Sequence, residues 1–407
     1  MSSTPIKACL AILASVAAVA RSASGGSFAD DLAFLKAHGD PIVLSDPSGA
    51  AEVVVEPSLQ GRVMTSTSTG GSGQSFGWIN RELIASGKVL PHMNAFGGED
   101  RFWMGPEGGQ FSIFFEKGKS FEIANWFTPA IFDTLPFEVV SQSRGAAVVG
   151  AKFSLTNYSG TTFRVEVRRR VQVLGAEASW RNLGMAPMAN VGLVGYETDN
   201  EVKNVGNDAW TKSTGLLSIW ILGQFNPSSR TTIVVPIKTG PESALGVKVT
   251  SNYFGEIPAT RLAVNDRAVF LAADGKYRSK IGINPRRCKA VLGSYDGINK
   301  VLTVVQFNQP DNVTDYVNSL WKLQDNPFGG DAANAYNDGP ATPGAKPMGP
   351  FYELESSSPA ASLAPGESLT HLRRTFHLSG PRIALDAVSR EVLGVSLDEI
   401  EGAFGTR

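Results

Sequence analysis

Residues 97–109, GGEDRFWMGPEGG, place four charged side chains and two aromatic rings among five glycines. Carboxylates and a guanidinium can form strong hydrogen bonds to a ligand, rings can stack on it, and glycines let the backbone come close. A phosphate-binding loop is excluded, because neither spacing typical of such loops occurs in this stretch and no helix is expected after it. A zinc site is excluded as well, because the chain has only four histidines and two cysteines.

Calcium is an alternative ligand for this stretch. Its acids do not alternate around a central glycine as they do in a calcium-binding loop. Oxygen ligands could still come from two segments together, in which case the set would be Glu99, Asp100, Glu107, Asp331, Asn334, Asn337 and Asp338. We expect no cofactor, with calcium kept as this alternative.

A sugar-binding surface fits the stretch best. Carboxylates and an arginine can bind vicinal hydroxyls in pairs, and an indole ring can stack on the C–H face of a pyranose. An alternative without any ligand is that Arg101 pairs with Glu99 or Glu107 while Phe102 and Trp103 enter the core. The predicted substrate-binding residues are Glu99, Asp100, Arg101, Trp103, Glu107, Trp126 and Tyr336.

Short strands must position these residues. Runs rich in β-branched or aromatic residues recur along the chain, separated by Gly, Asn, Asp, Ser or Pro, and no long helix intervenes. This pattern predicts an antiparallel, all-β architecture. The runs are 42–46, 51–57, 61–69, 110–116, 137–143, 146–157, 162–174, 216–225, 231–237, 261–273, 300–309, 350–358 and 368–380.

Helices are expected only near the two ends. Ser27 is a plausible N-cap for a helix over 27–38, and Ser396 with Glu399 forms a capping-box pattern within 381–405. The Gly/Pro/Asn-rich segment 325–350 is predicted to be one long loop of a kind that is often functional. We expect one domain over 24–380, with the helical segment 381–407 packed on it.

The first 24 residues have the three-part form of a secretory signal peptide, with cleavage expected after Ala20 or Ala23. We therefore expect 1–23 to be removed and the protein to be secreted or periplasmic, with no membrane contact afterwards. Cys288 would then be the only cysteine, which excludes an internal disulfide.

The charge balance argues against nucleic acid as a partner. The formal net charge is −1, and the one basic run, RVEVRRRV at 164–171, alternates like a half-exposed strand rather than forming a basic patch. The sequence leaves the oligomeric state open.

Three segments follow one another along the chain: AEVVVEPSLQGRVMTSTST, HMNAFGGEDRFWMGPEGG and FYELESSSPAASLAPGESLTHLRRTFHL. In this order they resemble the aldose 1-epimerase (galactose mutarotase) superfamily, and most closely its secreted bacterial members of unknown function. The resemblance implies a galactose-mutarotase-like β-supersandwich with short N- and C-terminal helices. It also implies carbohydrate as the partner.

The resemblance implies acid–base chemistry at a sugar ring. In that family a glutamate on a late strand is the base, and Glu353 and Glu355 are the candidates here; two apart on a strand, they point to the same face. His92 stands for one family histidine as the acid. The second family histidine has no counterpart, because no histidine occurs between 93 and 370. His371 and His377 are expected to be structural.

Three functional interpretations remain open. The first is an epimerase-like isomerase that uses Glu353, Glu355 and His92. The second is a glycoside hydrolase with two facing carboxylates, or a polysaccharide lyase with Tyr336 as its base. The third is a sugar-binding protein without catalysis. All three predict a secreted, carbohydrate-recognising protein.

Overall fold

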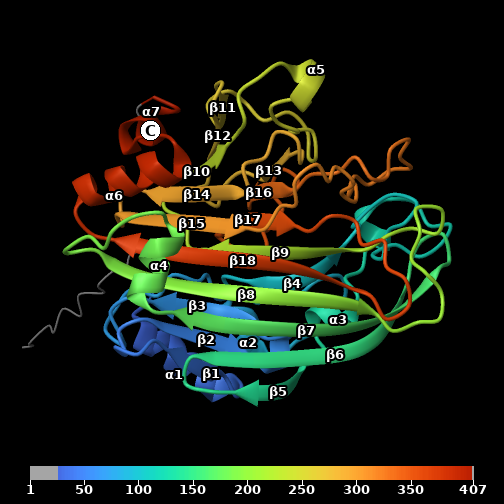
Figure 1. Cartoon of the computed structure of the whole chain (residues 1–407), viewed down its shortest axis with the longest axis horizontal. Coiled ribbons are helices and arrows are strands. Elements are labelled where there is room, and N and C mark those ends of the chain that lie inside the picture. The colour runs from blue at the N-terminus through green and yellow to red at the C-terminus, as the bar shows by residue number, and fades with distance from the viewer. Residues whose placement is uncertain (1–25, 406–407) are drawn as a thin grey trace, which may run out of the picture.

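The computed structural model describes residues 26–405, which form three antiparallel β-sheets with short helices at both ends (Figure 1). The largest sheet has ten strands and runs across the whole molecule. In spatial order its strands are β11 (Leu262–Val264), β12 (Ala268–Ala272), β10 (Thr231–Pro236), β14 (Val291–Asp296), β15 (Val301–Phe307), β18 (Ser368–Ser379), β8 (Gly192–Asn204), β7 (Thr162–Leu174), β6 (Ala146–Thr156) and β5 (Glu138–Gln142).

Two smaller sheets complete the β-structure. The five-stranded sheet has the order β13 (Ser279–Ile283), β16 (Ala333–Asn337), β17 (Tyr352–Ser357), β9 (Ser218–Phe225) and β4 (Arg101–Gly105). The three-stranded sheet consists of β1 (Ile42–Ser45), β2 (Glu52–Glu56) and β3 (Arg62–Thr67).

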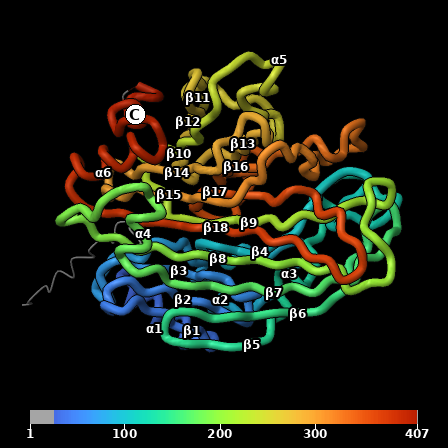
Figure 2. The backbone as a smooth tube through the Cα atoms, viewed as in Figure 1, coloured from blue at the N-terminus to red at the C-terminus, as the bar shows by residue number. Residues whose placement is uncertain are grey.

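The helices are short, and none of the described ones is long and apolar enough to cross a membrane. The backbone trace shows α1 and α7 at opposite edges of the molecule (Figure 2). The helical elements are α1 (Phe28–His38), η1 (Pro57–Leu59), α2 (Arg81–Ser86), η2 (Ile123–Asn125), α3 (Ala130–Asp133), α4 (Ala176–Asn182), α5 (Glu242–Leu245), α6 (Arg382–Val388), η3 (Ser389–Leu393) and α7 (Leu397–Gly402).

One face of the five-stranded sheet packs on the ten-stranded sheet. Ile219 and Ile221 of β9 lie in the same buried cluster as Val165 and Val167 of β7. A second cluster joins β13, β16 and β17 to β10, β12 and β15 in the same way. This burial of two apolar faces against each other is a β-sandwich, so the predicted all-β class is confirmed. The opposite face of the five-stranded sheet is left to carry polar side chains.

The predicted terminal helices are confirmed, but the expectation that helices occur only near the two ends is wrong, because the short helices α2 to α5 lie between them. Ser27 caps α1 through a capping box with Asp30, and Ser396 caps α7 through a capping box with Glu399. The predicted signal segment 1–23 lies outside the described residues.

The strand predictions are confirmed for twelve of the thirteen runs, with two strands in 261–273, and are wrong for 110–116, which forms turns. The rings of Phe114 and Phe115 are buried there in an aromatic cluster, and the backbone pairs only through an isolated bridge between Phe115 and Trp126, so the run resembles a strand without forming one. Segment 325–350 is not one loop, because β16 lies within it. Strands β4, β8, β13 and β14 were also missed.

Candidate functional site

A row of polar side chains crosses the five-stranded sheet. Lys280 of β13 lies opposite Tyr336 of β16, and Tyr336 lies opposite Glu353 of β17. Glu353 in turn lies opposite Gln224 of β9. Directly opposed residues on antiparallel strands have Cβ atoms about 5 Å apart on the same face. The register therefore assembles four polar side chains from four separate segments of the chain.

Two further rows lie on the same face. Residues two positions apart on a strand face the same side, so Leu222 and Glu355 share the face of Gln224 and Glu353. In this second row Arg101 of β4 lies opposite Leu222, and Leu222 lies opposite Glu355. In the next row Trp103 lies opposite Trp220. The stretch 97–109 therefore contributes one edge strand of the site.

Glu353 is held by two donors. Its Oε1 accepts a hydrogen bond from Nη2 of Arg101 at 3.0 Å and another from Nε2 of Gln224 at 3.0 Å. The side chains of Arg101 and Glu353 are only 3% and 8% exposed. Burial raises the pKa of Glu353 to about 7, with Arg101 opposing the rise and Glu355 adding to it. Glu353 can therefore exchange a proton near neutral pH.

Glu355 is fully buried and does not line the cleft. Its Oε2 accepts hydrogen bonds from Nε1 of Trp220 at 2.9 Å and from Nζ of Lys280 at 3.0 Å. Burial disfavours the charge on Lys280, but the nearby carboxylates of Glu355 and Glu107 outweigh it and raise the pKa of Lys280. Glu355 is thus the counter-ion of Lys280 beneath the floor of the cleft.

The polar face opens into a cleft with two adjoining parts. We call the part that Arg101 and Glu353 line the inner compartment; it has a volume of about 260 Å³. The outer compartment has a volume of about 470 Å³ and includes Tyr253, Ser319 and Asp338. Both volumes are bounded by Glu107, Ile123, Phe254, Arg278, Lys280, Trp321, Tyr336 and Met348, so the compartments share one wall.

Aromatic rings form the walls of the inner compartment. The rings of Trp103 and Trp220 meet edge to face with their centroids 5.6 Å apart. Trp126 stacks on Trp321 at 5.8 Å. The guanidinium of Arg101 lies 4.3 Å from the centre of the Trp103 ring. Rings fixed in this way are apolar walls that a flat ligand can stack on.

His92 lines the inner compartment from a loop. Its Nδ1 lies 2.6 Å from the carbonyl oxygen of Trp126, and its ring stacks on Phe127. Because a carbonyl can only accept, Nδ1 carries the hydrogen, and Nε2 of the neutral ring keeps its lone pair. The Nε2 atom is therefore the one able to take up and deliver a proton.

Two further predicted residues line the cleft. Burial raises the pKa of Glu107, and the charge of Lys280 lowers it in part. The hydroxyl of Tyr336 donates to Oδ1 of Asp338 at 2.7 Å. Burial and the charge of Asp338 raise the pKa of Tyr336 well above its usual range. Glu107 is thus a second titratable carboxyl of the cleft, whereas Tyr336 stays protonated.

Glu99 and Asp100 lie in the interior, and this placement corrects the prediction that they contact a ligand. Glu99 accepts hydrogen bonds from Ser66 and lies 3.0 Å from Nε2 of His377. Asp100 is enclosed by Arg169, at 2.5 Å, and Arg373, at 3.3 Å, with all three side chains 0% exposed. Alternation explains this for Asp100, because the residue next to Arg101 faces the opposite side; Glu99 precedes the first residue of β4 by two positions.

Neither late-strand histidine lines the cleft. His371 is fully buried with Nε2 at 2.9 Å from the hydroxyl of Ser356, and burial lowers its pKa to about 3. His377 joins Glu99 to Thr303. Within residues 26–405, no group of three or more His, Cys, Asp or Glu side chains is arranged to hold a metal ion.

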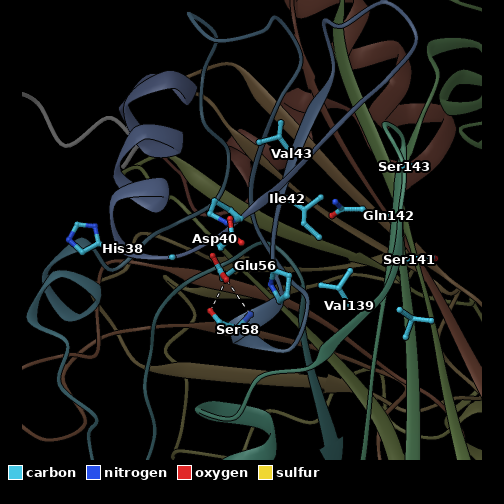
Figure 3. Close-up of a pocket in the computed structure, with 14 residues that line it drawn as sticks. His38, Asp40, Ile42, Val43, Glu56, Ser58, Val139, Ser141, Gln142 and Ser143 are labelled. Atoms are coloured by element: carbon cyan, nitrogen blue, oxygen red, sulfur yellow. Dashed lines mark hydrogen bonds between the residues drawn. The ribbon is translucent and has the colours of Figure 1, made fainter.

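A larger cavity of about 1000 Å³ lies elsewhere, between the end of α1, β1 and the edge strand β5 (Figure 3). Its lining includes His38, Asp40 and Gln142, and the carboxylate of Glu56, which accepts hydrogen bonds from the backbone N–H and the hydroxyl of Ser58. None of the predicted site residues lines it. Its lining has no aromatic wall, so we place the candidate site in the cleft on the five-stranded sheet.

Sequence reasoning placed Glu353, Arg101, Trp103, Glu107, Trp126, Tyr336 and His92 in one site, and all seven line the inner compartment. It missed Lys280, Arg278 and Trp321. A signal for Lys280 exists in the sequence SKIGI, where a lone lysine interrupts an otherwise apolar strand. Arg278 and Trp321 lie outside strands and have no comparable pattern.

The fold and the cleft define an all-β sandwich with a titratable, aromatic-walled site. The chain belongs to a family of unknown function, DUF6786, whose model matches residues 26–404. No curated protein matches the chain.

Solved structures of similar fold include mutarotase-like proteins. A putative aldose 1-epimerase from Escherichia coli K12 is 13% identical with a TM-score of 0.46, and the match covers 84% of this chain and 99% of that one. A galactose mutarotase-like protein from Lactobacillus casei ATCC 334 is 10% identical with a TM-score of 0.46, covering 83% and 100%. The Slr1438 protein from Synechocystis sp. PCC 6803 is 14% identical with a TM-score of 0.48, covering 84% and 96%. At such low similarity these matches say nothing about the chemistry of the cleft.

Proposed function

We propose that this protein binds carbohydrate in the cleft and that Glu353 exchanges a proton with the sugar at its anomeric centre. The observation that supports this most is the setting of Glu353, a carboxyl oriented by Arg101 and Gln224 under indole walls. Indole rings stack on the apolar faces of sugars, and fixed polar groups bind hydroxyls. A carboxyl with a pKa near 7 is matched to proton transfer at neutral pH.

The reaction that fits these groups is ring opening and reclosure of an aldose. Ionised Glu353 would take the proton of the anomeric hydroxyl, and His92, once Nε2 has taken up a proton from solvent, would deliver that proton to the ring oxygen. The electron pair of the O–H bond then forms the carbonyl as the ring C–O bond breaks. Reclosure on the other face of the carbonyl returns both protons, so no other reactant is consumed.

The test is NMR observation of anomer interconversion for a panel of free aldoses. We expect acceleration over buffer by the wild type and at least a hundredfold loss in Glu353→Gln, because general base catalysis contributes about 10²–10⁴-fold. Glu138→Gln, on an exposed edge strand, is the matched control and should act like wild type. Absence of acceleration at micromolar wild-type protein would sink the isomerase proposal.

A second candidate is a glycoside hydrolase, which the position of Glu107 favours. Glu107 and Glu353 both line the inner compartment, and hydrolases use two carboxyl groups on either side of the scissile bond. Digestion of polysaccharides followed by product sizing tests it, and both Glu107→Gln and Glu353→Gln should abolish cleavage. A lyase with Tyr336 as base is disfavoured, because the raised pKa of Tyr336 keeps its proton in place. Sugar binding without turnover would leave the non-catalytic binding protein.

We also propose export, on the strength of the signal-like form of residues 1–24 alone. N-terminal sequencing of the protein recovered from outside the cytoplasm is the check. A mature start after Ala20 or Ala23 is expected, whereas an intact start at Met1 would refute the proposal.

A further inference from the structure

Arg278 is a cation of the cleft that has no carboxylate partner among residues 26–405. No ion pair or side-chain hydrogen bond joins it to another residue within the described part of the chain. Its guanidinium lies 3.8 Å from the centre of the Phe254 ring. It borders both compartments and is partly exposed. The hydrogen-bond donors of Arg278 are therefore free for a ligand.

The other two strong cations of the cleft are already neutralised. Arg101 is paired with Glu353 at 3.0 Å, and Lys280 with Glu355 at 3.0 Å. Both pairs lie on the floor of the cleft, where the sheet register holds them. An incoming anion would have to displace a buried carboxylate from either, whereas it can approach Arg278 directly.

The carboxyl groups of Asp338 and Glu107, which lie beside Arg278, are not its counter-ions. Asp338 accepts hydrogen bonds from the Tyr336 hydroxyl at 2.7 Å and from the backbone N–H of Gly349 at 2.9 Å. Burial raises the pKa of both Asp338 and Glu107, although Arg278 lowers each in part. Within the described residues, neither acid forms an ion pair with Arg278. Lys346 at the rim of the outer compartment is exposed and lies 3.8 Å from the carboxylate of Glu82.

We propose that the ligand is an anionic glycan and that Arg278 binds its charged group in the outer compartment. The proposal rests on the proposed sugar-binding function of the same cleft. A guanidinium offers two parallel N–H donors, which match the oxygens of a carboxylate, sulfate or phosphate. Because the two compartments adjoin, the cleft can hold more than one sugar ring. One ring would lie at Glu353 in the inner compartment, and the charged group would lie in the outer compartment.

Calorimetry with matched glycans tests this inference. The probes are oligogalacturonides, neutral galactose oligomers of equal length, and galactose 6-sulfate and 6-phosphate, each titrated at low and high salt. We expect at least one anionic probe to bind about tenfold or more tightly than its neutral counterpart, because a charge-assisted bidentate bond has about that effect. The preference should shrink as salt rises. The arms distinguish a uronate from a sulfated or phosphorylated sugar.

Variants of Arg278 test whether this residue causes the preference for anionic glycans. Arg278→Gln should remove the preference for the anionic probe and leave binding of the neutral one unchanged. Arg278→Lys keeps the positive charge but lacks the two parallel N–H donors of the guanidinium, so it should retain part of the preference for the anionic probe. Arg286→Gln is the matched control, because Arg286 is exposed and does not border either compartment. The unfolding temperatures of all three variants should match that of the wild type.

The outcomes separate this inference from the function it rests on. Equal affinity for neutral and anionic glycans, or an unchanged preference in Arg278→Gln, would overturn the inference while sugar binding stands. Inorganic sulfate that binds as tightly as the anionic glycans would also overturn it, since the sugar would then contribute nothing. Failure of every glycan, neutral or anionic, to bind would overturn the proposed function itself.

Discussion

The guanidinium of Arg101 lies 3.0 Å from the carboxylate of Glu353, although the two residues are 252 positions apart in the chain. Strands β4 and β17 both pair with β9, so one central strand brings them together. Because both side chains are almost fully buried, the protonation state of Glu353 affects the stability of the fold as well as the chemistry of the cleft.

The first prediction concerns pH. Glu353 has an ordinary pKa of 4.5 and a pKa of about 7 in the fold, so between these values the folded state binds more protons than the unfolded one. The free energy of unfolding should fall by up to about 3 kcal/mol as pH rises from about 4.5 to 7. Glu353→Gln should lack this fall, whereas the exposed control Glu138→Gln should keep it. Urea unfolding at several pH values measures it, and parallel curves for wild type and Glu353→Gln would contradict the prediction.

The second prediction separates the interior acids from the cleft. Asp100→Asn leaves the buried guanidiniums of Arg169 and Arg373 without their counter-ion. Loss of one partner of a buried ion pair costs about 3–5 kcal/mol, so the urea midpoint should fall sharply. The exposed control Asp311→Asn should stay within about 0.5 kcal/mol of wild type. A variant of native stability that had lost glycan binding would instead place Asp100 in the ligand site.

The sequence predicted the sheets better than the site, for a physical reason. The run 162–174 alternates in hydrophobicity, and that period is a local property of a strand. The site depends on register between β13, β16, β17 and β9, which no local pattern encodes. Glu353 was found through a family resemblance. Lys280 was missed because its partner, Glu355, is distant in sequence.

The stretch 97–109 illustrates the same limit. Its composition indicated ligand-binding residues throughout, but the alternation of β4 turns Arg101 and Trp103 to the cleft and Phe102 to the core. Two of its glycines, Gly97 and Gly98, allow a backbone conformation with positive φ, at 99° and 108°.

The third prediction tests that role of the glycines. A Cβ on Gly97 would lie 2.1 Å from the carbonyl oxygen of Trp78, in addition to the strain of its positive φ. Gly70 also has a positive φ, of 71°, but a Cβ there would meet nothing within 4 Å. Gly70→Ala should therefore cost about 1 kcal/mol from backbone strain alone, and Gly97→Ala should cost several times more. Thermal unfolding compares them; equal losses would show that the close approach is unimportant.

The fourth prediction concerns Cys288, which is buried and whose pKa is raised by burial to about 12. The thiolate is the reactive form, so Cys288 should resist a thiol reagent in the folded protein and react within minutes in denaturant. The protein is used as Cys9→Ser, so that Cys288 is the only thiol. Rapid labelling under native conditions, at a rate unaffected by denaturant, would contradict the described burial.

The fifth prediction concerns the aromatic wall of the cleft. Trp321 is partly exposed, borders both compartments and stacks on Trp126. If a sugar ring stacks there, Trp321→Ala should weaken binding of the best glycan about tenfold, since an aromatic contact is worth about 1 kcal/mol beyond its buried area.

The matched control for Trp321 is Trp210, which packs edge to face on Phe163 in the core and does not border the cleft. Trp210→Phe should lower the unfolding temperature and leave affinity unchanged, because a smaller ring leaves a void without touching the wall. Calorimetry and thermal unfolding on both variants separate the two effects, because one variant should lose affinity and the other stability. If Trp321→Ala loses stability but not affinity, this wall is part of the core, and the sugar must rest on Trp103 and Trp220 instead.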